Sequence, residues 1–262
     1  MYDFNYVKPG SVDEAAQALA SGEAMAISGG QTLLPTMKAR LAQPDALIDL
    51  TGCVSSAISS DGSTLQIGGA ARHAAVAADA NVPGWLQNVA AHIGDPAVRN
   101  RGTIGGSLAN NDPAACYPAA VLGTGAQVVT NKRTIDADDF FQGMFTTALD
   151  EGEIVTGVNF PTGAVQAANY QKFVQPASRF ALVGVFVAKM SDGVRVAVTG
   201  ASEEGVHRWG AAEAALSANF SADAVPAAPG ADGMIGDIHG SPEYRAHLVG
   251  VMTKRAVAAA SA

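Results

Sequence analysis

Two stretches of the chain carry adjacent glycines between an extended run and a helix-like run. The first is AISGGQTLLPTMKARL, from Ala26 to Leu41, and the second is RGTIGGSLANNDPAACYPA, from Arg101 to Ala119. Glycine tolerates positive φ and has no Cβ, so successive N–H groups at such a turn can converge on one anion. A helix that begins behind the turn adds its own N-terminal N–H groups. Both stretches are therefore predicted to be loops that grip a diphosphate.

The alternative for either glycine pair is a plain turn between packed elements. The stretch around Gly123 and Gly125 is not a dinucleotide fingerprint, because Val128 occupies the third glycine position. Neither glycine pair is followed by the Gly-Lys-Ser/Thr of a P-loop. A bound diphosphate would therefore require a different architecture.

Composition excludes several classes of function. The chain has 262 residues, 48% of them hydrophobic, and a net charge of −8. No Lys/Arg cluster suggests nucleic acid or an anionic membrane surface. No apolar run is long enough for a membrane span, and the N-terminus MYDFNYVKPG has no signal-peptide pattern. We therefore expect a cytoplasmic protein without a membrane span and without nucleic-acid partners.

Catalytic and metal sites are not indicated. Two cysteines, Cys53 and Cys116, are too few for a four-thiolate iron–sulfur cluster. Cys116 is interpreted as a packing residue. No histidine pair has metal-ligand spacing, so the five histidines are predicted to lie on the surface or at helix ends: His73, His92, His207, His239 and His247. Any redox chemistry here would require an organic cofactor.

The pattern of residues predicts an α+β chain with three parts, at residues 1–55, 56–163 and 167–262. The first contains a capping box at Ser11 and Glu14, strands at 24–27 and 46–50, and a short helix at 35–41. Residues 161–168 are predicted to be a linker. Two strands joined by the turn at 191–193 follow, and then two helices with a Pro/Gly-rich loop between them.

Four motifs, in this order, carry a family resemblance: SGGQTLLPTMKARL, GDPAVRNRGTIGGSLANNDPAACYPA, FFQGMFTTALDEGEIV and SPEYRAHL. Nearly the whole chain resembles the FAD-binding medium subunit of the molybdenum hydroxylases, the family of xanthine dehydrogenase and aerobic carbon monoxide dehydrogenase. The resemblance implies a two-subdomain FAD-binding fold of the vanillyl-alcohol oxidase type. A C-terminal α+β domain with a small antiparallel sheet would complete the chain.

The resemblance also implies an electron-transfer function. Electrons would pass from [2Fe-2S] clusters on a small subunit through FAD to an external acceptor, and a large subunit would carry the molybdenum cofactor and hydroxylate the substrate. The complex would be a dimer of heterotrimers. FAD is expected to be non-covalent, because no histidine or cysteine lies in a flavin-linkage motif. The alternatives are a stand-alone FAD oxidase or dehydrogenase and a nucleotide-binding module without redox function.

Carried over by motif, the resemblance assigns cofactor contacts to 14 residues and names no catalytic residue or metal ligand. Ile93 would lie near the adenine, Asp112 near sugar hydroxyls, and Lys172 near the flavin. Two departures from the family pattern change the charge nearby: Cys116 and Tyr117 replace Asp and Leu, and Pro176 and Arg179 replace Arg and Asp. The full set is Ser28, Gly29, Gly30, Gln31, Thr32, Leu33, Ile93, Thr103, Ile104, Gly105, Gly106, Ser107, Asp112 and Lys172.

Overall fold

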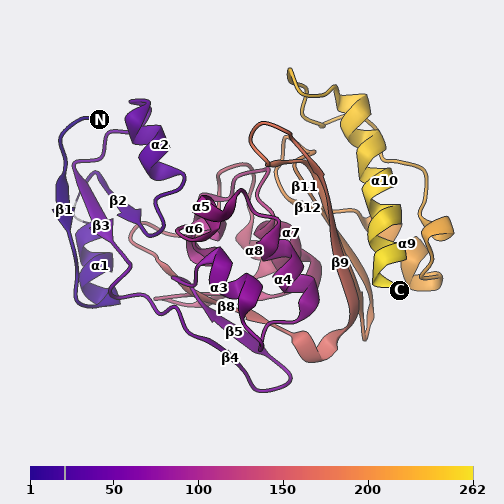
Figure 1. The fold of residues 1–262 in the computed structure, drawn as a ribbon, viewed down its shortest axis with the longest axis horizontal. Coiled ribbons are helices and arrows are strands. Elements are labelled where there is room, and N and C mark those ends of the chain that lie inside the picture. Colours follow the sequence, from indigo (N-terminus) through magenta and orange to yellow (C-terminus); the bar gives the residue numbers. More distant parts are fainter. Residues whose placement is uncertain (21, 262) are drawn as a thin grey trace.

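The computed structural model describes residues 1–20 and 22–261, and its strands form three separate sheets. Figure 1 shows them as an N-terminal lobe, a middle unit and a C-terminal sheet with its own helices. Separate sheets with helices beside them make this an α+β fold, as predicted.

The N-terminal lobe is a parallel sheet in the order β1-β3-β2, formed by β1 (Asn5–Val7), β3 (Ala46–Asp49) and β2 (Ala24–Ile27). Helix α1 (Val12–Leu19) begins at Ser11, whose Oγ accepts a hydrogen bond from the Glu14 N–H. The helix packs Ala15 against Ile48 on one face of the sheet. The predicted strands at 24–27 and 46–50 and the capped helix are confirmed, whereas β1 was not anticipated.

The middle unit is an antiparallel sheet in the order β4-β5-β8-β6-β7. Its strands are β4 (Ile58–Ser60), β5 (Leu65–Gly68), β8 (Val155–Phe160), β6 (Gln127–Thr130) and β7 (Thr134–Asp136). Its helices are α3 (His73–Ala78), α4 (Gly84–Ala91), α5 (Pro96–Arg99), α6 (Ile104–Asn110), α7 (Tyr117–Thr124) and α8 (Ala137–Phe140). Every residue of α7 is buried, because this helix lies between the middle unit and the C-terminal sheet.

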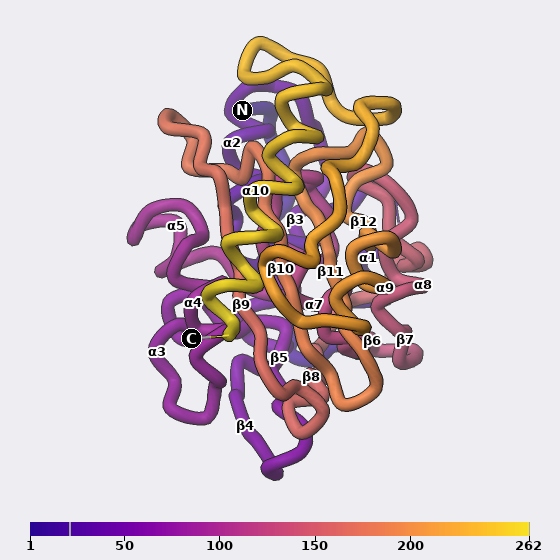
Figure 2. Tube along the Cα trace, turned by 90° about the vertical axis from the view of Figure 1, so that its right-hand side faces the viewer, coloured from indigo at the N-terminus to yellow at the C-terminus, as the bar shows by residue number. Residues whose placement is uncertain are grey.

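The C-terminal unit is an antiparallel sheet in the order β12-β11-β10-β9. It contains β9 (Val165–Val174), β10 (Ala181–Met190), β11 (Gly193–Thr199) and β12 (His207–Arg208), followed by α9 (Gly210–Ala218) and α10 (Pro242–Ala260). Strand β10 is buried on both faces. Val185 packs in the cluster under α9 and α10, whereas Phe186 points into the core of the middle unit. Figure 2 shows α10 crossing the outer face of this sheet.

The prediction of a linker at residues 161–168 is wrong. A short 3₁₀ turn at Thr162–Ala164 leads directly into β9, whose first residue, Val165, pairs with Met190. The Ser191 N–H also donates to the Ala164 carbonyl, at 2.9 Å. The residues after Gly163 complete a strand against the apolar β10. The middle and C-terminal units are therefore joined without a free connection.

Candidate functional site

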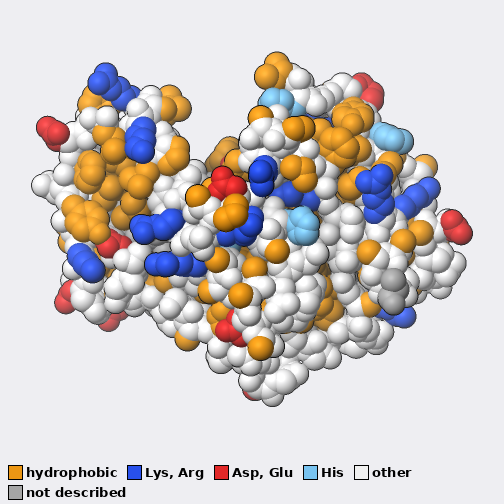
Figure 3. Space-filling view, viewed as in Figure 1, with side chains coloured by type: hydrophobic (Ala, Val, Ile, Leu, Met, Phe, Trp, Pro, Cys, Tyr) orange, Lys and Arg blue, Asp and Glu red, His pale blue; other side chains and the backbone are white. Residues whose placement is uncertain are grey.

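A cavity of about 730 Å³ lies between the N-terminal lobe and the middle unit and extends to the C-terminal sheet. The hollow between the lobe and the rest of the molecule is visible in Figure 3. Its volume is within the range of small-molecule and cofactor sites, roughly 300–1,000 Å³. All three units contribute to its wall, among them the segments Gly29–Leu33, Gly105–Ser107, Glu151–Val155 and Ser178–Phe180.

The first glycine segment presents free backbone donors to this cavity. Strand β2 ends at Ile27, the chain turns at Gly30 with φ +69°, and α2 (Leu33–Lys38) begins directly behind the turn. Helix α2 starts two residues earlier and ends three earlier than predicted. Within the described residues, no acceptor is present for the N–H groups of five consecutive residues: Gly29, Gly30, Gln31, Thr32 and Leu33. Five free donors at a helix start suit an anionic group.

The second glycine segment differs from the predicted loop, because Gly105 and Gly106 lie in the first turn of helix α6. The cap is Thr103, whose Oγ1 accepts from the Gly106 N–H at 3.2 Å and whose carbonyl accepts from Ser107. The N–H groups of Ile104 and Gly105 donate to the carbonyls of Ala71 and Gly69. All four N–H groups from Ile104 to Ser107 therefore have acceptors inside the protein, and the predicted contact of this segment with a diphosphate stays a prediction.

Two of the four glycines make room for protein backbone. A Cβ at Gly29 would lie 2.2 Å from the Arg101 carbonyl oxygen, and one at Gly105 would lie 2.7 Å from the Gly69 oxygen. Such contacts exclude any side chain at these positions. A hydrogen bond of 3.1 Å from Thr103 Oγ1 to Ser28 Oγ also ties the two segments together. Gly29 and Gly105 thus serve packing, whereas Gly30 supplies the positive φ of the turn.

Thirteen of the 14 predicted contact residues border the cavity, and Ile104 does not. The Ile104 side chain is fully buried in the core of the middle unit, and its predicted contact with a cofactor stays a prediction. Asp112 borders the cavity with one carboxylate oxygen already held by the Ala114 N–H, at 2.8 Å. Burial raises the pKa of Asp112.

Lys172 fixes the geometry at the C-terminal end of the cavity. Its Nζ donates to the carbonyl oxygens of His92, at 2.5 Å, and Arg179, at 2.9 Å, and to the Sγ of Cys116 at 3.5 Å. Ile93 follows His92 directly, so Ile93 and Lys172 lie at the same end of the cavity. Two groups this close cannot contact opposite ends of an extended dinucleotide.

His73 was predicted to be a surface or capping histidine and is instead part of the cavity wall. Its side chain is buried, its backbone N–H donates to the Gly102 carbonyl at 3.0 Å, and its ring lies 5.3 Å from that of Tyr117. Burial, with Arg99 nearby, lowers the pKa of His73 to about 4. The sequence holds no signal for this position, because Gly102 is 29 residues away.

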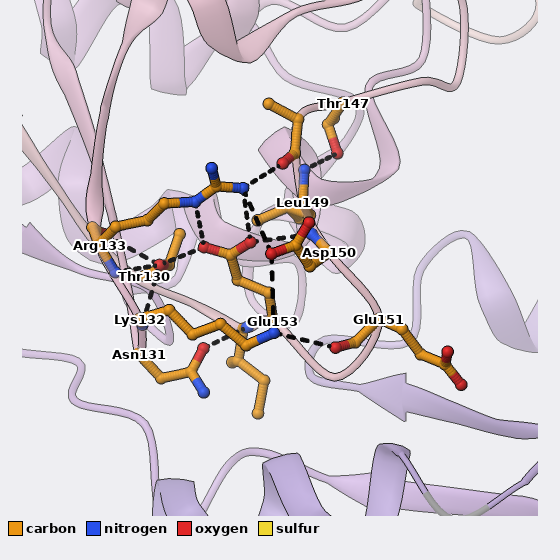
Figure 4. Close-up of polar contacts among 11 residues, drawn as sticks. Thr130, Asn131, Lys132, Arg133, Thr147, Leu149, Asp150, Glu151 and Glu153 are labelled. Carbon is orange, nitrogen blue, oxygen red and sulfur yellow. Dashed lines mark hydrogen bonds and ion pairs between the residues drawn. The ribbon is translucent and has the colours of Figure 1, made fainter.

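The segment Glu151–Val155 of the wall is held by a buried carboxylate that sequence reasoning missed. Figure 4 shows Glu153 bound by the Nε and Nη2 of Arg133, at 3.1 and 3.0 Å. The Thr130 hydroxyl and the Asp150 N–H also donate to it. Burial alone would raise the pKa of Glu153, but these hydrogen bonds dominate and lower it to about 2. The ionised carboxylate therefore anchors this part of the wall to the β6–β7 hairpin.

Residues 1–20 and 22–261 contain neither a metal-binding cluster nor a membrane-spanning helix. No group of three or more His, Cys, Asp or Glu side chains there could hold a metal ion. None of the helices combines the length and apolar character that crossing a bilayer requires.

Residues 2–163 match the family model described as the FAD binding domain in molybdopterin dehydrogenase. This match covers more than half of the chain, and together with the cavity it shows that the chain belongs to this family. The chain is thus the FAD-binding medium subunit of an oxidoreductase of the molybdenum hydroxylase class. The resemblance noted from the motifs is confirmed, and the cavity with its free N–H groups is the site that fits the cofactor.

Relatives of known function cover almost the full length. The chain is 36% identical to the nicotine 6-hydroxylase medium subunit of Paenarthrobacter nicotinovorans, over 98% of this chain and 97% of that one. It is 34% identical to the carbon monoxide dehydrogenase medium chain of Hydrogenophaga pseudoflava, over 98% and 96%.

Solved structures give the same result. The match to carbon monoxide dehydrogenase from H. pseudoflava has a TM-score of 0.88 and 33% identity, over 99% of this chain and 98% of that one. The match to quinoline 2-oxidoreductase from Pseudomonas putida 86 has a TM-score of 0.87 and 30% identity, over 99% and 97%.

Proposed function

We propose that this chain holds FAD non-covalently in the cavity and passes electrons from the iron–sulfur clusters of a small partner subunit to an external acceptor. A large subunit with the molybdenum cofactor would hydroxylate the substrate, and the complex would be a dimer of heterotrimers in the cytoplasm. The observation that supports this most strongly is the row of five free N–H groups on the wall of a cavity large enough for a cofactor.

The diphosphate is assigned to the turn Gly29–Leu33, because the N–H groups and the start of α2 favour negative charge there. The second segment contributes hydroxyl groups and packing, since its N–H groups are already bonded. Thr103 and Ser107 border the cavity and remain candidate contacts, as does the carboxylate of Asp112 for sugar hydroxyls.

The isoalloxazine ring is assigned to the end of the cavity at Lys172 and Ile93. Ser178, Arg179 and Phe180 of the C-terminal unit also line this end. Ile93 would then contact the ring, and the adenine would occupy the opposite end beside β2. Bound FAD would supply the redox chemistry, while the residues of this chain bind it, orient it and exclude water.

Release of the cofactor by acid tests the mode of attachment. His73 and Cys116 are the histidine and cysteine side chains bordering the cavity within the described residues, so a covalent link would involve one of them. We expect trichloroacetic acid to leave all flavin in the supernatant. Flavin that stays with precipitated wild-type protein, but not with His73→Gln or Cys116→Ser, would refute non-covalent binding.

Reconstitution tests the division of labour. The purified chain should show a flavin spectrum that dithionite bleaches, yet hydroxylate no aromatic substrate. Hydroxylation should appear only when the molybdenum and iron–sulfur subunits of the same host are co-expressed. Turnover of an organic substrate by this chain alone would replace the proposal with a stand-alone oxidase, and absence of flavin would favour a module without redox function.

A further inference from the structure

A second cavity, of about 690 Å³, lies beside the first, at the end of β9 and the start of β10. The linings of the two cavities have three residues in common, which are Ala114, Ser178 and Phe180. Phe180 is a large aromatic side chain on this boundary and is 49% exposed. Its ring is therefore available to a molecule in either cavity.

A buried arginine fixes one side of the second cavity. Arg245 is 3% exposed, and its Nη1 donates to the carbonyl oxygens of Leu182 and Gly200, at 2.7 Å each. Its Nη2 forms an ion pair with Asp237, also at 2.7 Å. These contacts join β10 and the end of β11 to the loop that precedes α10. This side of the cavity is therefore formed by the protein alone, before any ligand binds.

The charges of the second cavity disfavour an anionic ligand. Arg245, the Lys or Arg residue found in its lining within the described chain, is neutralised by Asp237. Glu203 also lines it, and no ion pair of this carboxylate is present among the described residues. The other cations nearby, Lys172 and Arg179, border the first cavity instead. A ligand with phosphate groups would therefore meet an unpaired carboxylate and no compensating cation.

The rest of the wall suits a neutral, planar molecule. Much of it is apolar, from Pro113, Ala114, Met144, Phe180, Leu182 and Ile235. Its hydrogen-bonding side chains include Gln175 and His239, whose Nε2 and Nδ1 lie 3.3 Å apart. An aromatic ring such as that of Phe180 can stack on a flat ligand, and amide and imidazole N–H groups can donate to carbonyl oxygens at its edge. A quinone combines these two features.

Unusual backbone conformations are concentrated around the same cavity. Four non-glycine residues of the described chain have positive φ, and three of them lie within two residues of its lining. These three are Asn111, Phe145 and Arg179. Backbone conformations of this kind cluster at ligand-binding sites. Their positions therefore support a binding function for this cavity.

We propose that the second cavity binds the external electron acceptor and that this acceptor is a neutral quinone. The quinone takes two electrons and two protons from reduced FAD, so that its two carbonyl groups become hydroxyl groups and oxidised FAD is regenerated. Phe180 lies between the two molecules, and His239 donates a hydrogen bond to a quinone oxygen. This inference rests on the proposed function, because it requires FAD in the first cavity with its ring at the Lys172 end.

The test uses the full chain loaded with FAD, and duroquinone, a neutral and fully methylated quinone. Calorimetry should show saturable binding to wild type. Met144→Asp places a carboxylate in the second cavity at a residue that is 38% exposed, and it should raise the Kd for duroquinone about tenfold or more. The matched control is Phe145→Asp, because this neighbouring residue is 59% exposed and lines neither cavity. FAD content should equal that of wild type in both variants.

Reoxidation of the flavin gives a second measurement. After anaerobic reduction and removal of dithionite, duroquinone should reoxidise the wild-type flavin at a rate that saturates with quinone concentration. Met144→Asp should require about tenfold more quinone for the same rate, as its Kd predicts. His239→Leu removes a hydrogen-bond donor from the second cavity only, and it should raise the Kd roughly 2- to 10-fold.

Three outcomes would overturn the quinone site. These are equal duroquinone Kd values for Met144→Asp and Phe145→Asp, a wild-type reoxidation rate that rises without saturation, and displacement of duroquinone by the anionic acceptor NAD⁺. Absence of FAD from the wild-type chain would instead refute the proposed function, because the calorimetry measures duroquinone binding separately from flavin content.

Discussion

The two glycine segments look alike in sequence and differ in what their backbones do. The N–H groups of Gly29–Leu33 have no acceptor and lie beside the cavity. In contrast, the four N–H groups of Ile104–Ser107 donate to the Thr103 cap and to neighbouring carbonyls. The first segment leaves its donors free for a ligand, whereas the second holds the middle unit together. A glycine pair therefore indicates close approach, but only the hydrogen bonds around it reveal whether ligand or protein approaches.

The largest effect should come from filling the second segment. Gly105→Val places side-chain carbon against the Gly69 backbone, so the free energy of unfolding of the FAD-free chain should fall by about 3 kcal/mol. Urea unfolding followed by circular dichroism measures this. Gly106→Ala is the control, because its Cβ meets only the Thr103 hydroxyl, at 3.0 Å. Equal stability of wild type and Gly105→Val would mean that this contact is not tight.

Gly30→Val should instead act mainly on the cofactor. Distortion of the turn misdirects the free N–H groups, and we expect the Kd for FAD to rise roughly 100-fold, or about 2.7 kcal/mol. The strain of a side chain at φ +69° should cost about 1–2 kcal/mol of stability, and the added Cβ, 2.9 Å from Leu34 Cδ1, must also displace that side chain. Gly233→Val has the same backbone strain, at φ +72°, without a contact to the added side chain, and it should leave FAD affinity unchanged. Flavin fluorescence titration measures the Kd of both variants. Equal affinities of Gly30→Val and Gly233→Val for FAD would contradict a binding role of the turn at Gly30.

Acid should destabilise the part of the cavity wall that Glu153 anchors, and it should not affect the free N–H groups of Gly29–Leu33. Glu153 has a pKa of about 2 in the folded chain against 4.5 when unperturbed, so the stability it supplies is complete above pH 4.5 and is lost as pH falls toward 2. Glu153→Gln should lower the free energy of unfolding at pH 7 by about 2 kcal/mol. The variant's stability should also depend less on pH between 4.5 and 2. Urea titrations at pH 3, 5 and 7 measure both. A variant whose stability falls as steeply with acid as wild type would disprove the assignment.

The smallest effects come from paired hydroxyl deletions. Thr103→Val removes the cap of α6 and should lower the free energy of unfolding by about 1 kcal/mol. Thr32→Val removes a hydroxyl that makes no capping bond, so it should leave stability unchanged and weaken FAD binding roughly 2- to 10-fold. Thermal unfolding and FAD titration of both variants test this. Weaker FAD binding in Thr103→Val together with lower stability in Thr32→Val would contradict the roles given to the two segments.

Local patterns predicted the strands at 24–27 and 46–50 and the capped helix α1, because period and caps depend on neighbouring residues. The start of α6 was missed although Thr103 precedes it, since two glycines in the first turn favour a loop on propensity alone. Gly29 and Gly105 were identified as positions of close approach, but Arg101 and Gly69 are 72 and 36 residues away. His73 depends on Gly102, and Glu153 on Arg133 and Thr130, which are also beyond the reach of a local pattern. The cofactor itself followed from the resemblance.

The direct passage from the middle unit into β9 determines how this chain can be recombined with its relatives. Phe186, Ala188 and Ala197 of the C-terminal sheet lie in the same core as Leu86 and Tyr117, so a crossover near residue 163 would divide one core between two parents. The N-terminal lobe has a smaller core around Ala15 and Ile48, to which the middle unit contributes Ile154. A chimaera that exchanges residues 1–55 should therefore fold more readily than one joined after β8. The N-terminal lobe can therefore be exchanged by itself, whereas the middle and C-terminal units should be exchanged together.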